Sequence, residues 1–232
     1  MSEAALLELR DISCLRDGKP IFSHVNITVN QGESASCSRV ATLTFAAGDI
    51  LVLRGKSGSG KTTLLKCIAH LVLYDGEVLY CGSTPKAFGV PSFRTRVLYV
   101  PQRPSMLPGT PRDFLTTITA LEAHKAHAHA LKKDHKPPHD PFARALHISR
   151  AWDVDPQLWG REWANLSEPT SALDSASTIA VEKLLLDEIR SSATTLKAMV
   201  WITHSDEQGS RIGNKFVQIS AGGCVEEPIP LV

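Results

Sequence analysis

The feature that most constrains this chain is a glycine-rich run, Gly55-Lys56-Ser57-Gly58-Ser59-Gly60-Lys61-Thr62. The mostly apolar segment 50–54 precedes it and predicts a buried strand, and apolar residues at helical spacing over 63–69 predict a helix directly after it. A strand, a glycine-rich turn and a helix in this order are the context that a phosphate-binding loop requires. A chance Gly/Ser-rich loop is the alternative, and the flanking strand and helix argue against it.

The residue types in this run suit a bound polyphosphate. Gly55, Gly58 and Gly60 leave the backbone N–H groups uncovered, so these groups can surround an anion at the positive end of the following helix. Lys61 can reach the β- and γ-phosphates, and the Thr62 hydroxyl can bind Mg²⁺, which prefers oxygen ligands. We therefore expect a nucleotide site here.

Composition limits the other functions. The chain has 232 residues, 43% of them hydrophobic, which fits one domain with a real core. The net charge of +1 provides no field that would attract nucleic acid. Five cysteines without regular spacing favour reduced thiols in the cytosol over a disulfide framework. Neither a signal peptide nor an apolar run long enough to span a bilayer is recognisable, so we expect a cytoplasmic chain whose membrane role depends on a separate partner.

Strand and helix patterns alternate along most of the chain. This alternation predicts an α/β fold with a layered, mainly parallel sheet, preceded by a hairpin-like β segment. Ligands bind at the carboxyl ends of such strands, and Gly55, Gln102 and His204 each fall just after one. The expected strands are 6–15, 21–29, 50–54, 78–81, 96–100, 199–202 and 215–219, and the expected helices are 63–69, 114–131, 141–152 and 179–189, the last with Ile179, Leu184, Leu185 and Leu186 facing inward.

Two segments have more than one interpretation. Residues 34–46 lie between two similar turn signals and look inserted, either as a surface excursion or as an extra edge hairpin with a short strand over 40–45. The stretch 124–139 is rich in histidine, and His124 and His127 lie one helical turn apart, which suits a metal site. No acidic or cysteine ligands complete that site, so a solvated helix end and loop is the favoured interpretation.

Further short motifs follow the phosphate loop in a fixed order. Gln102 ends the run Val-Pro-Gln, Leu166-Ser167 begins a signature-like pair, Glu168 to Asp174 reads Glu-Pro-Thr-Ser-Ala-Leu-Asp, and His204 ends Ile-Thr-His. Together they make the chain resemble the ATP-binding subunit of ABC transporters over nearly its whole length. The runs 99–109 and 200–204 look most similar to the small iron-export-type (Fet-like) subunits. The resemblance implies a P-loop NTPase three-layer fold over residues 1–232, with a truncated helical subdomain at about 103–167.

The resemblance also implies roles for individual residues. Glu168 would be the general base for the attacking water, and His204 would hold the γ-phosphate. Gln102 would contact Mg²⁺ or the water and couple the site to a membrane partner, while Asp174 would contact a second ATP-binding subunit across a dimer. Arg16 lies where the family has an aromatic residue, and its guanidinium can stack on adenine instead. The implied nucleotide ligands are Arg16 and Gly55 to Thr63, with Thr62 and Gln102 on Mg²⁺ and Lys61, Gln102, Glu168 and His204 in catalysis.

The chain departs from the family pattern between Ser167 and Glu168. There the family has the rest of the signature, a long helix and an apolar strand that ends in Asp-Glu, whereas here the two residues are adjacent. Ser167 therefore stands both for the signature serine and for the Mg²⁺-ordering aspartate. We expect slow hydrolysis, weak ATP-driven dimerisation and a sheet without one central strand, the partner of 97–100. A splice or gene-model variant would explain both this junction and the segment 34–46.

Three functions compete on this evidence. The leading one is an ATP-hydrolysing subunit that drives a separate permease from the cytosolic face of a membrane. The alternative is a nucleotide-binding, hydrolysis-deficient module. A P-loop kinase or another ATPase is disfavoured because the run from Glu168 to Asp174, followed by Thr203-His204, is an ABC pattern and not a kinase one.

Overall fold

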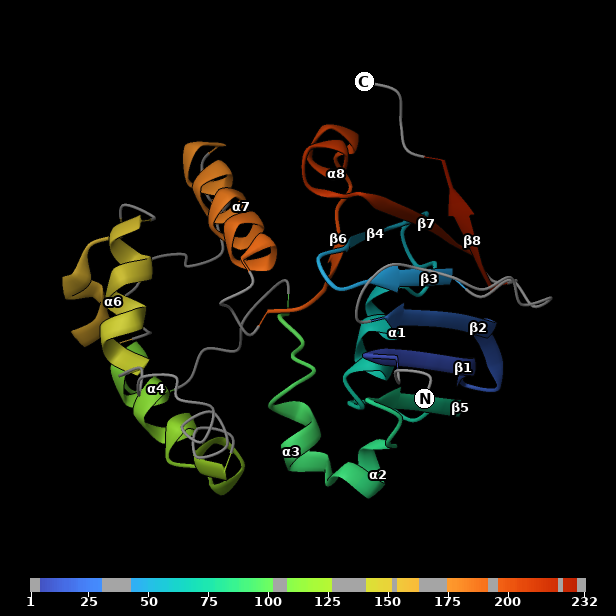
Figure 1. Cartoon of the computed structure of the whole chain (residues 1–232), viewed down its shortest axis with the longest axis horizontal. Coiled ribbons are helices and arrows are strands. Elements are labelled where there is room, and N and C mark those ends of the chain that lie inside the picture. Colours follow the sequence, from blue (N-terminus) through green and yellow to red (C-terminus); the bar gives the residue numbers. More distant parts are fainter. Residues whose placement is uncertain are drawn as a thin grey trace. The chain divides into compact units, whose positions relative to one another are not determined.

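The computed structural model describes residues 5–30, 43–101, 108–126, 141–151, 154–162, 175–191, 196–220 and 223–228. The chain divides into two compact units. The first comprises Met1–Tyr99 and Leu186–Val232, and the second comprises Val100–Leu185. Figure 1 shows that the described strands belong to the first unit.

The first sheet of the larger unit begins with the predicted hairpin. Strands β1 (Leu7–Arg16) and β2 (Lys19–Asn30) pair antiparallel around Asp17 and Gly18, whose φ angles of 52° and 73° fit a tight primed turn. Strand β5 (Asp75–Tyr80) adds antiparallel to β1. Strand β3 (Leu43–Ala46) pairs parallel to β2, so the sheet order is β3-β2-β1-β5. The short strand predicted within 34–46 is thus an edge strand and not a hairpin arm of β2, and residues 34–42 lie outside the described residues.

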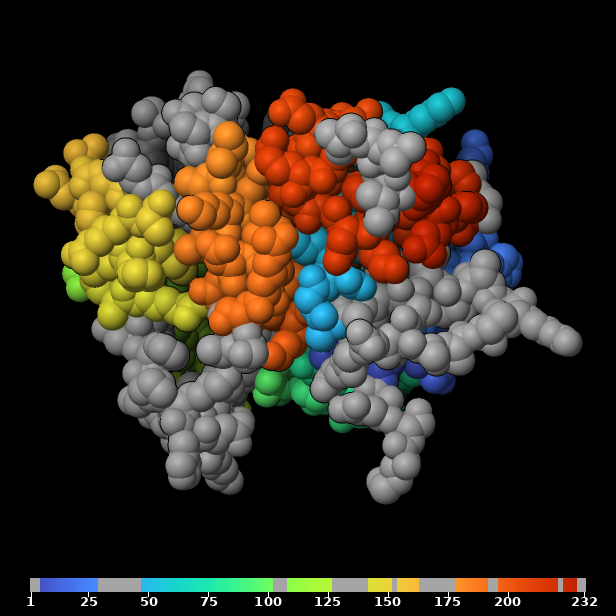
Figure 2. Space-filling view, turned by 45° about the horizontal axis from the view of Figure 1, so that its top comes forward, coloured from blue at the N-terminus to red at the C-terminus, as the bar shows by residue number. Residues whose placement is uncertain are grey.

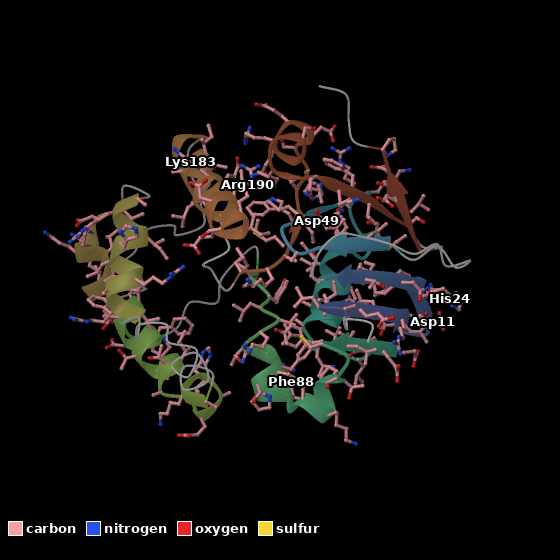
Figure 3. The ribbon with its side chains drawn as sticks, viewed as in Figure 1. Asp11, His24, Asp49, Phe88, Lys183 and Arg190 are labelled. Atoms are coloured by element: carbon pink, nitrogen blue, oxygen red, sulfur yellow. The ribbon has the colours of Figure 1, made fainter. Side chains whose placement is uncertain are left out.

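The β1–β2 ladder has a bulge at Asp11 and His24. Both residues have positive φ, 53° and 56°, and the register shifts beside them. His24 Nδ1 lies 2.6 Å from Asp11 Oδ1, and Figure 3 labels the two residues side by side on the two central strands of the sheet. Two backbone N–H groups at the bulge bond to side-chain oxygens. Asp11 N donates to Asn26 Oδ1, and His24 N donates to Ser13 Oγ. The bulge is therefore hydrogen-bonded locally.

The second sheet contains the strand that leads into the phosphate loop. Strands β6 (Met199–Ile202), β4 (Ile50–Arg54) and β7 (Lys215–Ser220) pair parallel, and β8 (Gly223–Glu227) adds antiparallel to β7 in the order β6-β4-β7-β8. Asn214 fastens β4 to β7 by accepting from Ile50 N and donating to Asp49, which is labelled in Figure 3. The predicted strands 50–54, 199–202 and 215–219 are confirmed; β8 was not predicted.

Side-chain alternation along β4 supplies two apolar surfaces. Leu51 and Leu53 join the main core, which also takes residues from β1, β2, β5, β7 and from helix α1 (Lys61–Ile68). Val52 faces a smaller cluster with Ile212 of helix α8 (Asp206–Ile212) and Phe216 of β7. Successive side chains of a strand point to opposite faces of the sheet, so one short apolar strand can hold α1 and α8 on different surfaces.

The predicted strand at 96–100 is wrong. Val97 packs against the main core, but no strand forms there, and Leu98 and Val100 are 72% and 84% exposed. A strand needs a neighbour for its backbone hydrogen bonds. Within the part of the sheet that the structure describes, β6 is the edge strand, and nothing pairs with 97–100. Helices α2 (Pro85–Phe88) and α3 (Val90–Arg94) lead into this segment.

The predicted helix 114–131 is shorter than expected. Helix α4 (Pro111–Thr119) ends at Ala120, 122–126 is a separate helical run, and 127–131 lie outside the described residues. The Thr116, Thr117 and Thr119 hydroxyls donate to carbonyls four residues back, at 2.8–2.9 Å. Such side-chain bonds and β-branching disfavour continued helix, which explains the early end.

The smaller unit is a cluster of short helices. Helix α4 packs with α6 (Pro141–Ala151), which confirms the predicted helix, and with the 3₁₀ helix η1 (Pro156–Gly160). Trp159 Nε1 donates to Ser149 Oγ at 2.8 Å, and its ring meets that of Phe142 edge-on at 5.8 Å. The Arg112 guanidinium lies over the ring of Phe142, 4.2 Å from the ring centre. These aromatic contacts give the unit a small core of its own.

Helix α7 (Ser175–Arg190) covers the predicted helix 179–189. Its buried positions are Glu182 and Ile189, whereas Ile179 is 51% exposed and Leu184, Leu185 and Leu186 are half-buried. The prediction that Ile179 faces inward is therefore wrong. The periodicity of a sequence indicates the apolar side of a helix, but it does not indicate which helical turns other elements cover. All four residues of strand β6 are half-buried, as suits an edge strand.

Candidate nucleotide site

The phosphate loop joins β4 to α1 through three glycines with positive φ. Gly55, Gly58 and Gly60 have φ of 143°, 81° and 94°. A Cβ on Gly55 would lie 2.6 Å from Ser59 Oγ and 2.7 Å from the Ile219 carbonyl, and a Cβ on Gly60 would lie 2.6 Å from Ile21 Cγ2. Both backbone angle and space therefore require glycine at these two positions.

Helix α1 begins directly at the loop. Gly60 is its N-cap residue in the left-handed conformation, with no side-chain cap, and Leu64 N donates to Gly60 O at 2.8 Å. The first N–H groups of a helix have no partner within the helix and carry its positive end. The loop thus ends where an anion is best stabilised.

Lys61 reaches back across the loop. Its side chain is buried at 6% exposure, and Nζ donates to the Gly55 carbonyl at 2.7 Å and to the Lys56 carbonyl at 3.0 Å. The ammonium group is therefore held inside the loop. Thr62 is exposed in the first turn of α1, so its hydroxyl is accessible, and the buried Ser59 Oγ has no hydrogen-bond partner among the described residues.

A cleft of about 430 Å³ opens beside the loop. Gly58 and Ser59 form one side of it, and the β1–β2 turn, with Arg16, forms the other. Arg16 lies 42 residues before Gly58 in the sequence. The structure nevertheless brings Arg16 next to the loop, at the end of the β1–β2 hairpin. The remaining lining residues, which sequence reasoning missed as site residues, are Asp17, Lys19, Pro20 and Ile21. The Asp-Gly turn signal predicts the hairpin, but nothing in that signal places the turn beside the loop.

His204 follows strand β6 in the same unit as the loop. Leu53 of β4 pairs with Ile202 of β6, so Gly55 and His204 both leave the carboxyl ends of neighbouring parallel strands. The His204 side chain is exposed. The turn that carries it is held by Thr203, whose hydroxyl donates to Gln208 Oε1 at 2.5 Å and accepts from Ser205 N at 3.0 Å.

Three predicted site residues, Gln102, Glu168 and Asp174, lie outside the described residues, as does Ser167. Most of the histidine-rich stretch also lies outside them. Across the described ranges no group of three or more His, Cys, Asp or Glu side chains could hold a metal. No helix in those same ranges is long and apolar enough to cross a membrane.

Comparison with known proteins identifies the family. Residues 39–224 match the family model described as ABC transporter. This chain belongs to the ABC transporter family. It is an ATP-binding subunit of the family, and members of this kind are ATPases. The predicted family and activity are thereby confirmed, and the P-loop kinase alternative is set aside.

Individual relatives of this ABC subunit are distant but match along most of their length. The phosphate import ATP-binding protein PstB 2 of Aliivibrio fischeri is 28% identical over 97% of this chain and 89% of its own. PstB 1 of Lactobacillus johnsonii is 29% identical over 89% of this chain and 84% of its own. A solved structure described as the ATP-binding subunit of an ABC transporter has a TM-score of 0.71 at 18% identity, over 97% of this chain and 90% of that one. The α/β fold class is confirmed by this likeness.

Proposed function

We propose that this ABC subunit binds Mg²⁺–ATP in the loop from Gly55 to Thr62 and couples its binding and hydrolysis to transport through a separate membrane permease. It would work on the cytosolic face of the membrane and pair with a second ATP-binding subunit. The observation that carries the proposal is the position of Lys61, whose buried ammonium lies inside a loop of three positive-φ glycines at the start of α1. A polyphosphate is the ligand that this arrangement suits.

The roles of the loop residues follow from their positions. Lys61 Nζ would exchange the Gly55 and Lys56 carbonyls for phosphate oxygens. The backbone of Gly58, Ser59 and Gly60 would surround the β-phosphate, and Arg16 would stack on the base in the adjoining cleft. Outside the loop, His204 would contact the γ-phosphate from the end of β6, and Glu168 would orient the attacking water.

The loop also fits a magnesium ion. Thr62 follows Lys61 in sequence and is exposed in the first turn of α1, and its hydroxyl is an oxygen donor of the kind that Mg²⁺ prefers. Thr62 and Gln102 would hold the ion, which when bound neutralises charge between the β- and γ-phosphates. Ser167 stands where an aspartate would order its water shell, and a hydroxyl cannot replace a carboxylate in that role.

We infer from the Ser167–Glu168 junction that hydrolysis is slow. The exposed Leu98 and Val100 and the half-buried edge strand β6 support the inference that a strand of the family sheet is missing. Glu168 would then follow a segment that no neighbouring strand fixes, so the general base would be poorly positioned. The alternative, a module that binds nucleotide without turnover, predicts the same binding and no hydrolysis.

The transported substrate would be selected by the membrane partner. The relatives compared above are named for phosphate import, whereas 99–109 and 200–204 resemble iron-export-type subunits. We propose no choice between the two. Transport of labelled phosphate and of iron by cells that express this chain with a cognate permease would separate them.

Nucleotide binding and turnover test the proposal together. Binding of a fluorescent ATP analogue with Mg²⁺ should weaken at least about 10-fold in Lys61→Ala, because two charge-assisted phosphate contacts are lost. The matched control is Lys86→Ala, which removes an exposed lysine of helix α2, outside the loop, and should bind as the wild type does. Equal affinity of the two variants would refute the loop assignment. Turnover that is low and unchanged in Glu168→Gln supports the slow-hydrolysis inference, and a robust rate that Glu168→Gln abolishes contradicts it.

A further inference from the structure

Arg54 is the one charged residue of β4 and directly precedes Gly55. It shares the sheet face of Val52, where its guanidinium carbon lies 4.6 Å from the ring centre of Phe216. Nη1 lies 3.8 Å from Glu227 Oε2, and Nη2 lies 3.6 Å from Asp206 Oδ1. The side chain is 20% exposed. Arg54 therefore joins the end of β4 to β7, β8 and the first turn of α8.

The contact with Asp206 is incomplete. Nη2 is buried and has no hydrogen-bond partner among the described residues, and the Asp206 oxygen stands just beyond hydrogen-bonding distance. Gly209 allows this approach, since even a Cβ there would lie 3.4 Å from Nη2. A buried donor without a partner is unfavourable, so a small inward movement of Asp206 would be stabilising. Asp206 can make that movement because its own side chain is 94% exposed, on the surface that α8, β7 and β8 form in red in Figure 2.

His204 stands directly before Ser205, the N-cap residue of α8. Ser205 caps the helix by accepting from Gln208 N at 3.1 Å, and Gln208 in turn accepts from the Thr203 hydroxyl. His204 lies between these two anchored residues. A shift of the first turn of α8 would therefore also move the His204 backbone, and Arg54, which directly precedes Gly55, is the ion-pair partner of Asp206 in that turn.

We propose that Arg54 is a positioning residue for the γ-phosphate contact, and that it acts through Asp206 on the turn that carries His204. This inference rests on the proposed function, since it assumes that His204 meets the γ-phosphate of ATP in the loop. In the presence of ATP, His204 is drawn toward the loop, the first turn of α8 follows, and Asp206 completes the hydrogen bond with Nη2. ADP lacks the γ-phosphate and leaves the pair as it is.

The test compares affinities for ATP and ADP in the full chain. Asp206→Asn should lower the preference for ATP over ADP about 2- to 5-fold, within the range for an exposed ion pair, while the ADP affinity stays unchanged. The matched control is Glu207→Gln. It removes the adjacent acid of the same helical turn, whose partner is Arg211 at 3.5 Å and not Arg54, and it should leave both affinities unchanged. Arg54→Met, which keeps the packing on Phe216, should reproduce Asp206→Asn, and the double variant should be no worse than either.

The outcomes are distinguishable. If Asp206→Asn and Glu207→Gln have equal effects, the change in affinity comes from the charge of the helix. If ATP and ADP lose affinity equally, Arg54 and Asp206 have only a structural role. Either outcome overturns the proposal. Absence of nucleotide binding by the wild type defeats the proposed function instead. In that case the melting temperatures of Arg54→Met, Asp206→Asn and the double variant are compared without nucleotide. If the changes in melting temperature are not additive, the two side chains interact as proposed. If they are additive, the Arg54–Asp206 contact is overturned.

Discussion

At the scale of single residues, the loop uses two physically different kinds of glycine. Gly58 and Gly60 both have positive φ, but a Cβ on Gly58 meets nothing within 4 Å, whereas a Cβ on Gly60 would meet Ile21 and Phe22 at 2.6 Å and 3.0 Å. Backbone strain thus acts at both positions and steric overlap at only one. The sequence motif does not distinguish them.

Substitution by alanine should separate the two effects. Gly58→Ala should cost about 1 kcal/mol, the strain of a left-handed alanine, and Gly60→Ala about 2–3 kcal/mol, because Ile21 and Phe22 must also move. Urea unfolding with fluorescence or circular dichroism measures both values. Equal costs would show that the contact of Gly60 with β2 relaxes freely.

Buried titratable groups predict how stability depends on pH. Burial, with Cys14 nearby, raises the pKa of the Cys67 thiol from 9.0 to about 12, and burial likewise raises the pKa of Tyr74 from 10.0 to about 12. The unfolded chain loses these protons first as pH rises, so stability is full below pH 9 and falls between about pH 9 and 12.

Thermal unfolding at a series of alkaline pH values measures this slope. In Cys67→Ala the decline should be shallower, since one titrating group is lost. It should begin at the same pH, because burial also raises the pKa of Cys224 from 9.0 to about 12. The cavity left by the smaller side chain lowers stability at all pH values and does not change the slope. An unchanged slope in Cys67→Ala would contradict the assignment.

At the scale of elements, α8 connects the smaller apolar cluster to the His204 turn. Gly209 and Gly213 are its two glycines, one within the helix and one at its C-cap. A Cβ on Gly209 would make ordinary contacts of 3.4–3.5 Å, whereas a Cβ on Gly213 would lie 2.4 Å from Val52 Cγ2. The two positions therefore respond oppositely to alanine.

Gly209→Ala should stabilise the protein by about 0.5–1 kcal/mol, because alanine loses less backbone entropy in a helix. Gly213→Ala should destabilise it by overpacking against Val52, by about 1–3 kcal/mol. The melting temperature would shift by roughly 2–4 °C for each kcal/mol in a chain of this size. A lower melting temperature for Gly209→Ala would show that the space beside Arg54 is needed.

Elements that carry their own signals were predictable from sequence. Strand β4 is apolar and bounded by turns, the β1–β2 hairpin has its Asp-Gly turn, and α6 and α7 are periodic. Segment 96–100 was not, because its apolar residues form a strand only beside a partner, and pairing is a property of the whole sheet. Strand β8 was missed for the same reason, since Gly223–Glu227 gains its strand conformation from pairing with β7.

The candidate site was predictable where one local motif defines it. The phosphate loop and the end of β6 lie where the spacing indicated, since parallel strands bring their carboxyl ends together. The contribution of Asp17 and Lys19 was not predictable, because it depends on how the β1–β2 turn approaches the loop. The role of Arg54 was not predicted, because in the sequence this residue only ends a strand. Its ion-pair partners, Asp206 and Glu227, lie 152 and 173 residues further along the chain.

At the scale of the whole molecule, the short junction at Ser167–Glu168 leads us to expect limited assembly. The resemblance implies a signature loop and a helix N-terminus that face the nucleotide of the opposite subunit, and the sequence retains only Leu166-Ser167 of it. A dimer held by ATP would lose a positive helix end at each of its two nucleotides. We therefore expect this chain to dimerise weakly.

Size-exclusion chromatography with and without Mg²⁺–ATP tests this expectation. Glu168→Gln should be used beside the wild type, so that slow hydrolysis does not disperse a dimer during the run. Both proteins should elute as monomers in ATP as well as in ADP. A dimer peak in ATP alone would contradict the weak-dimer expectation and would indicate that Leu166-Ser167 suffices for the contact.

The inward position of Lys61 has a consequence for selectivity in a phosphate-rich solution. Without nucleotide, its ammonium is already satisfied by two backbone carbonyls of the loop, so an incoming anion must compete with the protein itself. A single phosphate or sulfate ion gains only one set of contacts from that exchange, whereas a nucleotide adds those of its further phosphates and of its base in the cleft beside Arg16. We therefore expect the loop to bind single phosphate and sulfate ions poorly and to prefer a complete nucleotide, since only the nucleotide would offset the two lysine–carbonyl bonds.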